Sequence, residues 1–248
     1  MRPYYQDHFA TVYNADSTEL LPLMEPESFE MVITDPPYSS GGLHAGERRL
    51  SVETKYSSDG QGCGRPTFSG DARDQRSFGF WSTMWMSQCR RLLKTGGYML
   101  VFTDWRQLPI VTDALQAADF IWRGVIAWDK GAGSRAPHKG YFRHQCEYVV
   151  WGTKGPCQKA IHAGPFPGCI HTPVLKADKF HQTGKPTALM RELVRVAKPN
   201  GRILDPFAGS LTTLVAAKLE ARRAVGIERE LPIVRDSIAR LTRSGSIS

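Results

Sequence analysis

The stretch MVITDPPY, residues 31–38, joins a short apolar run to a rigid polar corner. The run 31–34 is typical of a buried strand, and the two prolines that follow allow neither a helix nor further sheet pairing. The chain therefore leaves the strand as a stiff, extended segment. Asp35 and the Pro36 carbonyl can both accept hydrogen bonds from one exocyclic amino group, and Tyr38 can stack on the ring that carries this group.

The tetrapeptide Asp35-Pro36-Pro37-Tyr38 resembles the catalytic DPPY motif of the amino-directed DNA methyltransferases, which use S-adenosylmethionine. In that family DPPY accompanies methylation of adenine N6, and Ser-Pro-Pro is more frequent for cytosine N4. The resemblance implies that these four residues are catalytic. A target base in double-stranded DNA has to leave the helix to be methylated, and Tyr38 would stack on the flipped base.

A second motif, DPFAGSLTT at residues 205–213, is a glycine-bearing turn between an expected strand and an expected helix. Parallel α/β sheets bind nucleotide-like ligands at such turns. The motif is not a P-loop, because no GK[ST] follows, and it lacks the GxGxxG of dinucleotide folds. Glu228 ends the next expected strand, 19 positions after Gly209, where an acid commonly holds ribose hydroxyls.

The resembled family has an FxGxGT loop around the methionine part of the cofactor, and Leu211 stands where that loop has its second glycine. An acid near the N-terminus lies beside the cofactor's adenine in the family, a role that Asp16 could fill, although a simple turn residue explains Asp16 nearly as well. The segment 181–186, HQTGKP, corresponds to a family segment that ends in Lys-Pro. The resemblance therefore implies cofactor contacts for Asp16, His181, Thr183, Lys185, Asp205, Phe207, Ala208, Gly209, Ser210, Thr212 and Glu228.

Expected strands and helices alternate along the chain, which predicts an α/β fold with a doubly wound, mostly parallel, Rossmann-like sheet. The DPPY motif precedes the cofactor loop, as in the circularly permuted, beta-type members of the resembled family, so the strands ending in Asp35 and Asp205 should lie side by side. We expect one domain over residues 1–248. The strands are expected at 11–16, 31–34, 98–102, 120–128, 147–151, 202–204 and 224–227, and helices at 80–93, 107–118, 187–197, 211–219 and 232–241, with a further helix capped by Ser17.

Two other local patterns predict a loop and a buried helix face. Residues 39–79 are rich in Gly and Ser and lack sustained periodicity, so we interpret them as a mobile flap over the substrate. In the helix that follows, Trp81, Met84, Trp85 and Leu92 share one apolar face, which we assign to the core.

The basic residues concentrate in one quarter of the chain. Residues 130–185 hold nine Lys and Arg against two acids, within a net charge of +8 and a pI near 9.4. Aromatic residues and histidines are interleaved there, which favours a nucleic-acid surface over a merely solvated basic face. We predict phosphate contacts from Arg135, Lys139 and Arg143, and place basic loops and a short target-recognition region within 130–180.

Composition argues against several other classes. No apolar window reaches the roughly 18 residues of a membrane span, and the N-terminus lacks a signal-peptide core, so a cytoplasmic protein is expected. Five cysteines without CxxC spacing fit reduced thiols, and His144 with Cys146 has no second pair to complete a metal site. Pro156-Cys157 follows the wrong strand for a cytosine-C5 nucleophile.

The alternatives that stay open at this stage are cytosine-N4, RNA or protein methylation by the same pocket, and a non-catalytic nucleic-acid binder of the same fold. Family members often dimerise, so a homodimer is possible. The recognition sequence does not follow from these residues.

Overall fold

The computed structural model describes residues 2–37, 73–131, 138–157, 162–173 and 184–243. The expected flap residues 39–72 lie outside this part of the chain. The last five residues of the expected flap, 75–79, are helical, because helix α4 (Gln75–Leu92) begins five residues earlier than its apolar periodicity indicates. Asp74 caps it, accepting from the backbone N–H groups of Arg76 and Ser77.

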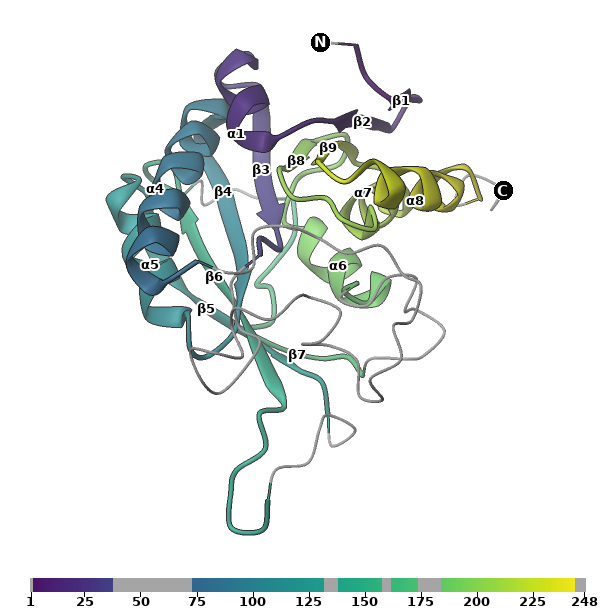
Figure 1. Ribbon diagram of the computed structural model, residues 1–248. Coiled ribbons are helices and arrows are strands. Elements are labelled where there is room, and N and C mark those ends of the chain that lie inside the picture. The colour runs from purple at the N-terminus through teal and green to yellow at the C-terminus, as the bar shows by residue number, and fades with distance from the viewer. Residues whose placement is uncertain (1, 38–72, 132–137, 158–161, 174–183, 244–248) are drawn as a thin grey trace.

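One nine-stranded sheet forms the centre of the molecule (Figure 1), with the order β1-β2-β9-β8-β3-β4-β6-β5-β7. All neighbouring pairs are parallel except β1 with β2 and the two pairs made by β6, which runs against both β4 and β5. The strands are β1 (Tyr5–Gln6), β2 (Ala10–Asn14), β3 (Phe29–Thr34), β4 (Leu93–Thr103), β5 (Ile121–Asp129), β6 (Cys146–Thr153), β7 (Cys169–His171), β8 (Arg202–Asp205) and β9 (Arg223–Glu228). The predicted fold class is therefore confirmed.

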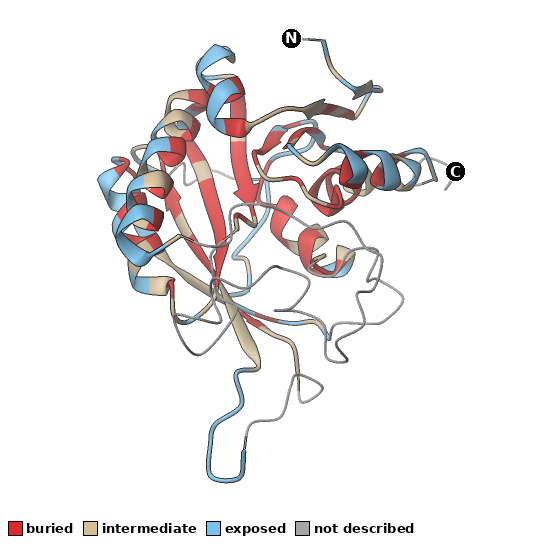
Figure 2. Ribbon diagram, in the orientation of Figure 1, coloured by how far each residue is buried: buried red, intermediate tan, exposed pale blue. Residues whose placement is uncertain are grey.

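Helices cover both faces of this sheet (Figure 1). One face carries α1 (Ser17–Leu20), η1 (Leu21–Leu23), α4 and α5 (Leu108–Ala117). The other face carries α6 (Thr187–Val194), α7 (Thr212–Leu219) and α8 (Leu231–Arg243). The central strands are buried on both sides (Figure 2), which explains why their sequences read as continuous apolar runs.

Successive side chains of the central strands alternate between the two hydrophobic cores. Met31 and Ile33 of β3 pack with α6, α7 and α8, whereas Val32 packs with α4 and α5. Phe29 also packs with α4 and α5, because the pairing of β3 with β4 shifts register between Phe29 and Met31. The buried stripe of α4 includes Trp85 and Leu92 as predicted, but Met84 is exposed, so its predicted burial is wrong.

Two short strands and one cap differ from the sequence prediction. β1 and β7 have two and three residues, too few to show a period. β7 pairs with β5 at one end of the sheet, so part of the predicted target-recognition region extends the sheet itself. Asp16, and not Ser17, caps α1: its carboxylate accepts from Thr18 N at 2.8 Å. No helix in the described ranges is long and apolar enough to cross a membrane.

Candidate active site

The site lies where the chain reverses its direction of travel across the sheet. β3 and β8 pair in parallel, with Val32 opposite Leu204. From β8 the chain crosses to β9, and from β3 it crosses to β4 on the other side, so this is a topological switch point. Asp35, directly after β3, and Asp205, the last residue of β8, therefore meet at one edge of the sheet, as the sequence predicted.

Asp205 ties the two strand ends together. Its Oδ1 accepts from Thr34 Oγ1 at 2.7 Å and from Phe207 N at 3.1 Å, and its Oδ2 accepts from Thr213 Oγ1. Burial raises the pKa of this carboxyl to about 6, although those hydrogen bonds favour its ionised form. Only 3% of Asp205 is exposed. Asp205 therefore holds the loop after β8, and the direct cofactor contact expected for it stays a prediction.

The loop after β8 presents a backbone surface at Gly209. This glycine has φ +46°, and a Cβ placed there would meet no atom of the described residues within 4 Å, so these residues leave open space beside the backbone. Phe207 packs its ring against Trp81 and Trp85 of α4, at 5.3 and 5.1 Å between ring centroids. The predicted loop thus stands between the sheet and α4.

The other predicted residues of this loop, Ala208, Ser210 and Thr212, are buried. Ser210 Oγ lies 3.2 Å from Thr212 Oγ1, and Arg240 of α8 donates to the Ser210 carbonyl and to Thr212 Oγ1. These three residues shape the loop from beneath, so any contact with a ligand would come from their backbone groups.

Leu211 occupies a conformation that normally belongs to glycine. Its φ of +60° and ψ of 22° are left-handed, and its side chain is fully buried in the core under α7. Such a backbone costs a leucine roughly 1–2 kcal/mol. Leu211 keeps the turn that the family's second glycine would make, and its side chain packs away from the loop surface.

Glu228 contacts the backbone of Gly209 through its side chain. Its Oε2 accepts from Gly209 N and its Oε1 from Glu230 N, both at 2.8 Å. Burial raises the pKa of Glu228 above its ordinary value, against the effect of these backbone hydrogen bonds. A carboxylate offers about four lone-pair sites, so two N–H donors leave capacity for hydroxyl groups.

Asp16 is brought to the same edge by the pairing of β2 with β9, in which Asn14 lies opposite Glu228. Asn14 Nδ2 donates to the carbonyls of Glu228 and Arg229, and Arg229 lies 3.4 Å from the Asp16 carboxylate. Asp16, Gly209 and Glu228 therefore lie near one another at this edge, and their expected cofactor contacts stay predictions.

Lys185 contacts the DPPY carboxylate. Its Nζ donates to Asp35 Oδ2 at 2.6 Å and lies 3.2 Å from Glu147 Oε2. The ammonium is 9% exposed, beside the rings of Phe102 and Trp128 at 5.1 and 6.0 Å. Burial would lower the pKa of Lys185, but Asp35 and Glu147 together raise it.

Sequence reasoning missed part of this arrangement. Glu147 is the second residue of β6, which runs antiparallel to β4, so it lies at the edge of the sheet where β4 ends. Arg73 and Trp81 also stand near the predicted loop, with the Arg73 guanidinium 4.3 Å from the Trp81 ring. A polar residue opening an apolar strand, as in Glu147-Tyr-Val-Val, was the available signal.

Several predicted residues lie outside the described part of the chain: Tyr38, Arg135, His181 and Thr183. Pro36 is buried and Pro37 half-buried directly after β3. Lys139 and Arg143 are exposed on the loop between β5 and β6. They therefore lie apart from the loop at Gly209, on a segment that projects from the body of the molecule (Figure 1). Across the described residues, no group of three or more His, Cys, Asp or Glu could hold a metal ion.

The described residues around the Gly209 loop fit S-adenosylmethionine as a ligand. The open space beside Gly209 admits a ligand close to the backbone, and Glu228 has acceptor capacity for ribose hydroxyls. Asp16 stands next to Glu228, and Lys185 supplies a cation beside Asp35.

Comparison with known proteins supports the same interpretation. A DNA methylase family model, N6_N4_Mtase, matches residues 29–164 and 165–239. The type II methyltransferase M2.LlaDCHI of Lactococcus lactis subsp. cremoris is 28% identical over 267 residues, covering 99% of this chain and 94% of that protein.

Two solved structures have a similar fold. The cytosine-N4-specific PvuII DNA methyltransferase superposes with a TM-score of 0.74 at 18% identity, covering 96% of this chain and 88% of its own. The structure of M1.HpyAVI in complex with S-adenosylmethionine gives 0.66 at 23% identity, covering 94% and 98%.

Proposed function

The chain belongs to the DNA methylase family N6_N4_Mtase, and from this premise we propose that it transfers a methyl group to N6 of adenine in DNA. Membership itself gives the coarser statement: the protein is a DNA methyltransferase of the N6/N4 type, with S-adenosylmethionine as methyl donor. The observation that carries the proposal is the rigid Asp35-Pro36-Pro37 segment beside the Gly209 loop at the switch point.

Asp35 and the Pro36 carbonyl act on the target amine. An exocyclic amine on a base is a poor nucleophile, because its lone pair is delocalised into the ring. When two fixed acceptors take its two hydrogens, the nitrogen moves toward sp³ geometry and its lone pair becomes available. Prolines on both sides of that carbonyl hold the acceptors in place.

S-adenosylmethionine supplies a methyl group made electrophilic by the positive sulfonium to which it is bonded. Glu228 and the backbone at Gly209 would hold it on one side of the site, and Asp16 its adenine end. Lys185, for which the family resemblance implies a cofactor contact, pairs with Asp35 and is therefore placed to orient the catalytic carboxylate.

The first residue of the motif supports adenine as the target. Aspartate at position 35 follows the family's pattern for N6 methylation, whereas serine accompanies N4 of cytosine more often. Methylation of a paired base also requires base flipping, which costs a few kcal/mol. We assign stacking on the flipped base to Tyr38.

Double-stranded DNA is the proposed partner, held through its phosphates by Lys139 and Arg143, which are exposed on the projecting loop. The segment available for target recognition, residues 152–180, is short and rich in Gly, Pro and His, so we propose few base contacts and a relaxed site specificity. A homodimer stays a prediction, which light scattering at assay concentration checks.

The test is transfer from tritiated S-adenosylmethionine to unmethylated duplex DNA, to RNA and to protein, each offered separately at equal mass. The proposal expects label in DNA alone. Label in RNA or protein but not in DNA would overturn it, and so would binding of DNA without any transfer.

A further inference from the structure

Four side chains of alternating charge form a row of ion pairs at the site. The ammonium of Lys185 lies between Asp35 and Glu147, and Lys130 Nζ donates to Glu147 Oε1 at 3.0 Å. They come from the end of β3, the segment before α6, the start of β6 and the residue after β5. We call Asp35, Lys185, Glu147 and Lys130 the charge chain.

Burial makes the pairing within the charge chain necessary. Lys185 is almost fully buried, and Glu147 and Lys130 each keep only 19% of the side chain exposed. A buried ion that loses its partner is strongly destabilising. Burial raises the pKa of Glu147, yet the ammonium groups of Lys185 and Lys130 bring it below its ordinary value. Glu147 is therefore an ionised, buried carboxylate next to the catalytic pair.

We propose that Glu147 is a positioning residue for methyl transfer, which holds the Lys185 ammonium against Asp35 Oδ2 and so fixes the catalytic carboxylate. This inference rests on the proposed role of Asp35. A lysine ammonium has three donors on a flexible stem, so one carboxylate does not fix its position. A second carboxylate on its other side does, and the Phe102 and Trp128 rings limit the remaining freedom.

Asp104 and Asp205 are further charged groups of the described residues near the charge chain. Asp104, after β4, interacts with Glu147, but its own carboxylate is held by the backbone N–H groups of Arg106 and Gln107. Asp205 interacts with Asp35 from β8. Both stay in place when Glu147 is changed, so a change in pH response reports on Glu147 and Lys185.

The experiment compares Glu147→Gln, Glu147→Asp and a matched control, Glu220→Gln. Glu220 is also a largely buried carboxylate that bridges two cations, Arg191 and Arg195. It follows the C-terminal end of α7, whereas the site adjoins the first turn of that helix. Steady-state kcat from pH 6 to 10 and calorimetric affinity for S-adenosylmethionine are measured for each. The ammonium resonance of Lys185, assigned with Lys185→Arg, is followed by NMR in protein labelled with ¹⁵N-lysine.

Glu147→Gln is expected to lower kcat at least tenfold with donor affinity within about threefold, and to move the alkaline limb of kcat down by about one pH unit or more. The Lys185 pKa falls in parallel, Glu147→Asp recovers part of kcat, and Glu220→Gln changes neither kcat nor its pH profile. Unchanged kcat and Lys185 pKa in Glu147→Gln would overturn the inference. A wild type that does not methylate DNA would instead overturn the proposed function, while the NMR titration still tests the pairing.

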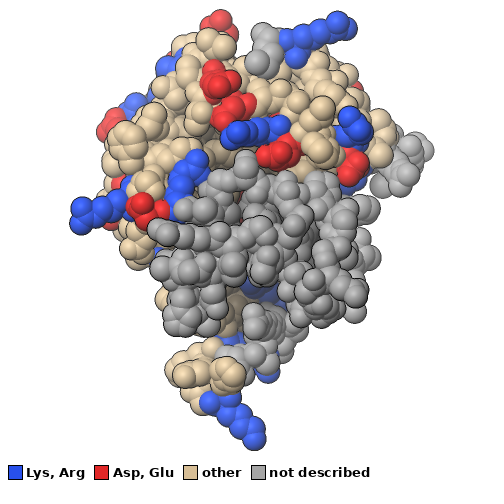
Figure 3. All heavy atoms as spheres, in the orientation of Figure 1, with Lys and Arg blue, Asp and Glu red and all other residues tan. Residues whose placement is uncertain are grey.

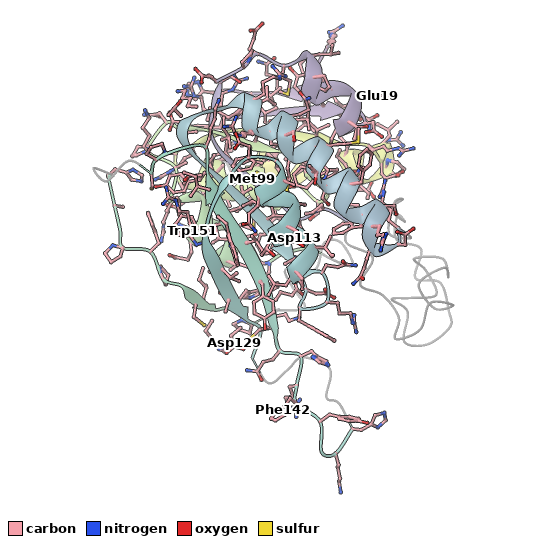
Figure 4. All side chains as sticks on the ribbon, turned by 90° about the vertical axis from the view of Figure 1, so that its left-hand side faces the viewer. Glu19, Met99, Asp113, Asp129, Phe142 and Trp151 are labelled. Carbon is pink, nitrogen blue, oxygen red and sulfur yellow. The ribbon has the colours of Figure 1, made fainter. Side chains whose placement is uncertain are left out.

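A second, independent observation concerns the loop between β5 and β6, which carries two exposed aromatic side chains. Tyr141 is 70% and Phe142 93% exposed. Phe142 points away from the body at the end of the projecting loop (Figure 4), where basic side chains also appear (Figure 3). His138 packs edge-on against Tyr141 at 6.1 Å, so this end of the loop has some internal order.

We infer that Phe142 inserts between base pairs of a DNA duplex while Lys139 and Arg143 neutralise the adjacent phosphates. Apolar side chains used in this way unstack a base step and bend the duplex. The inference rests on DNA as the substrate. Charge complementarity selects this partner, since the exposed rings are flanked by cations on both sides.

Binding to two duplexes, one fully paired and one with a single central mismatch, tests the wedge. An unstacked step accepts a wedge at lower cost, so the wild type is expected to prefer the mismatched duplex at least threefold. Phe142→Ala loses this preference and about tenfold in affinity, and Phe142→Trp keeps both. Phe80→Ala, a matched control on α4 with 71% exposure, changes nothing. Equal binding of both duplexes by the wild type and Phe142→Ala would overturn the wedge, whereas no DNA binding by the wild type would overturn the substrate.

Discussion

Lys185 Nζ and Asp35 Oδ2 form a 2.6 Å hydrogen bond between residues that are 150 positions apart in the sequence. The bond joins the DPPY motif, in the first part of the chain, to the segment that leads into the cofactor loop. Folding of the two parts of the chain onto one sheet edge therefore brings the Asp35 carboxylate to its cation. Mutations on either side of this bond should separate chemistry from donor binding.

Asp35→Ala is expected to abolish methyl transfer while donor affinity stays within a few-fold, because the carboxylate acts on the amine and not on the donor. Asp113→Ala, an exposed aspartate on α5, is the control with unchanged rate. Initial rates with tritiated donor and calorimetry decide the matter. More than a tenth of the wild-type rate in Asp35→Ala would refute the catalytic role.

Glu228→Ala should weaken binding of S-adenosylmethionine by about 1.5–3 kcal/mol, through loss of charge-assisted hydrogen bonds to the ribose. The variant also releases the Gly209 N–H that Glu228 holds at 2.8 Å, which acts in the same direction. Glu19→Ala, an exposed acid on α1, should bind as the wild type does. Calorimetric affinity that does not change in Glu228→Ala would show that the ribose lies elsewhere.

Asp205 makes stability depend on pH in a direction opposite to most carboxyl groups. Its pKa rises from 3.8 to about 6 on folding, so between these values the native state binds more protons than the unfolded state. Its contribution is complete below pH 3.8 and is lost as pH rises through 6. A shift of two units corresponds to about 3 kcal/mol.

Asp205→Asn removes that titration. The free energy of unfolding of the wild type, relative to this variant, should fall by about 3 kcal/mol from pH 3.5 to 7, as measured by urea denaturation. Asp7→Asn is the control of opposite sign, because hydrogen bonds from Lys218 and the backbone outweigh burial and lower the pKa of Asp7. A relative stability of Asp205→Asn that is flat with pH would contradict the assignment.

Lys139 and Arg143 are expected to contact phosphates. Each alanine variant should weaken binding on two unrelated duplexes alike, and lower the slope of log K against log salt by about one unit. A base-reading arginine would instead cost roughly 1–3 kcal/mol on one sequence alone. Unchanged slopes for both variants would move the DNA surface away from this loop, most simply to residues 39–79. Arg135, outside the described residues, is tested in the same way.

Motif order and strand periodicity were enough to predict the fold. The apolar runs before Asp35 and Asp205 are buried on both faces, so their continuous hydrophobicity identifies them as strands. The DPPY and DPFAGSLTT motifs that follow them predicted which strand ends should meet. β1 and β7 escaped notice because two or three residues show no period, and β7 in addition pairs only with β5, which lies far earlier in the chain.

The site was predicted in part. Glycine in the cofactor loop and an acid after the next strand are local signals, so Gly209 and Glu228 could be named. Glu147 and Lys130 could not, because their roles arise from strand pairing between β5 and β6, which brings a surface-like charge into a buried position. Leu211 shows the reverse case, where a residue unlike the family's glycine still adopts the glycine's backbone conformation.

Identification of the methylated base is the most direct test of the central claim. Unmethylated duplex DNA is incubated with the protein and S-adenosylmethionine carrying a deuterated methyl group, digested to nucleosides, and analysed by mass spectrometry against authentic standards. The account predicts deuterated N6-methyladenine, which is absent with Asp35→Ala. Deuterated N4-methylcytosine in place of N6-methyladenine would contradict it.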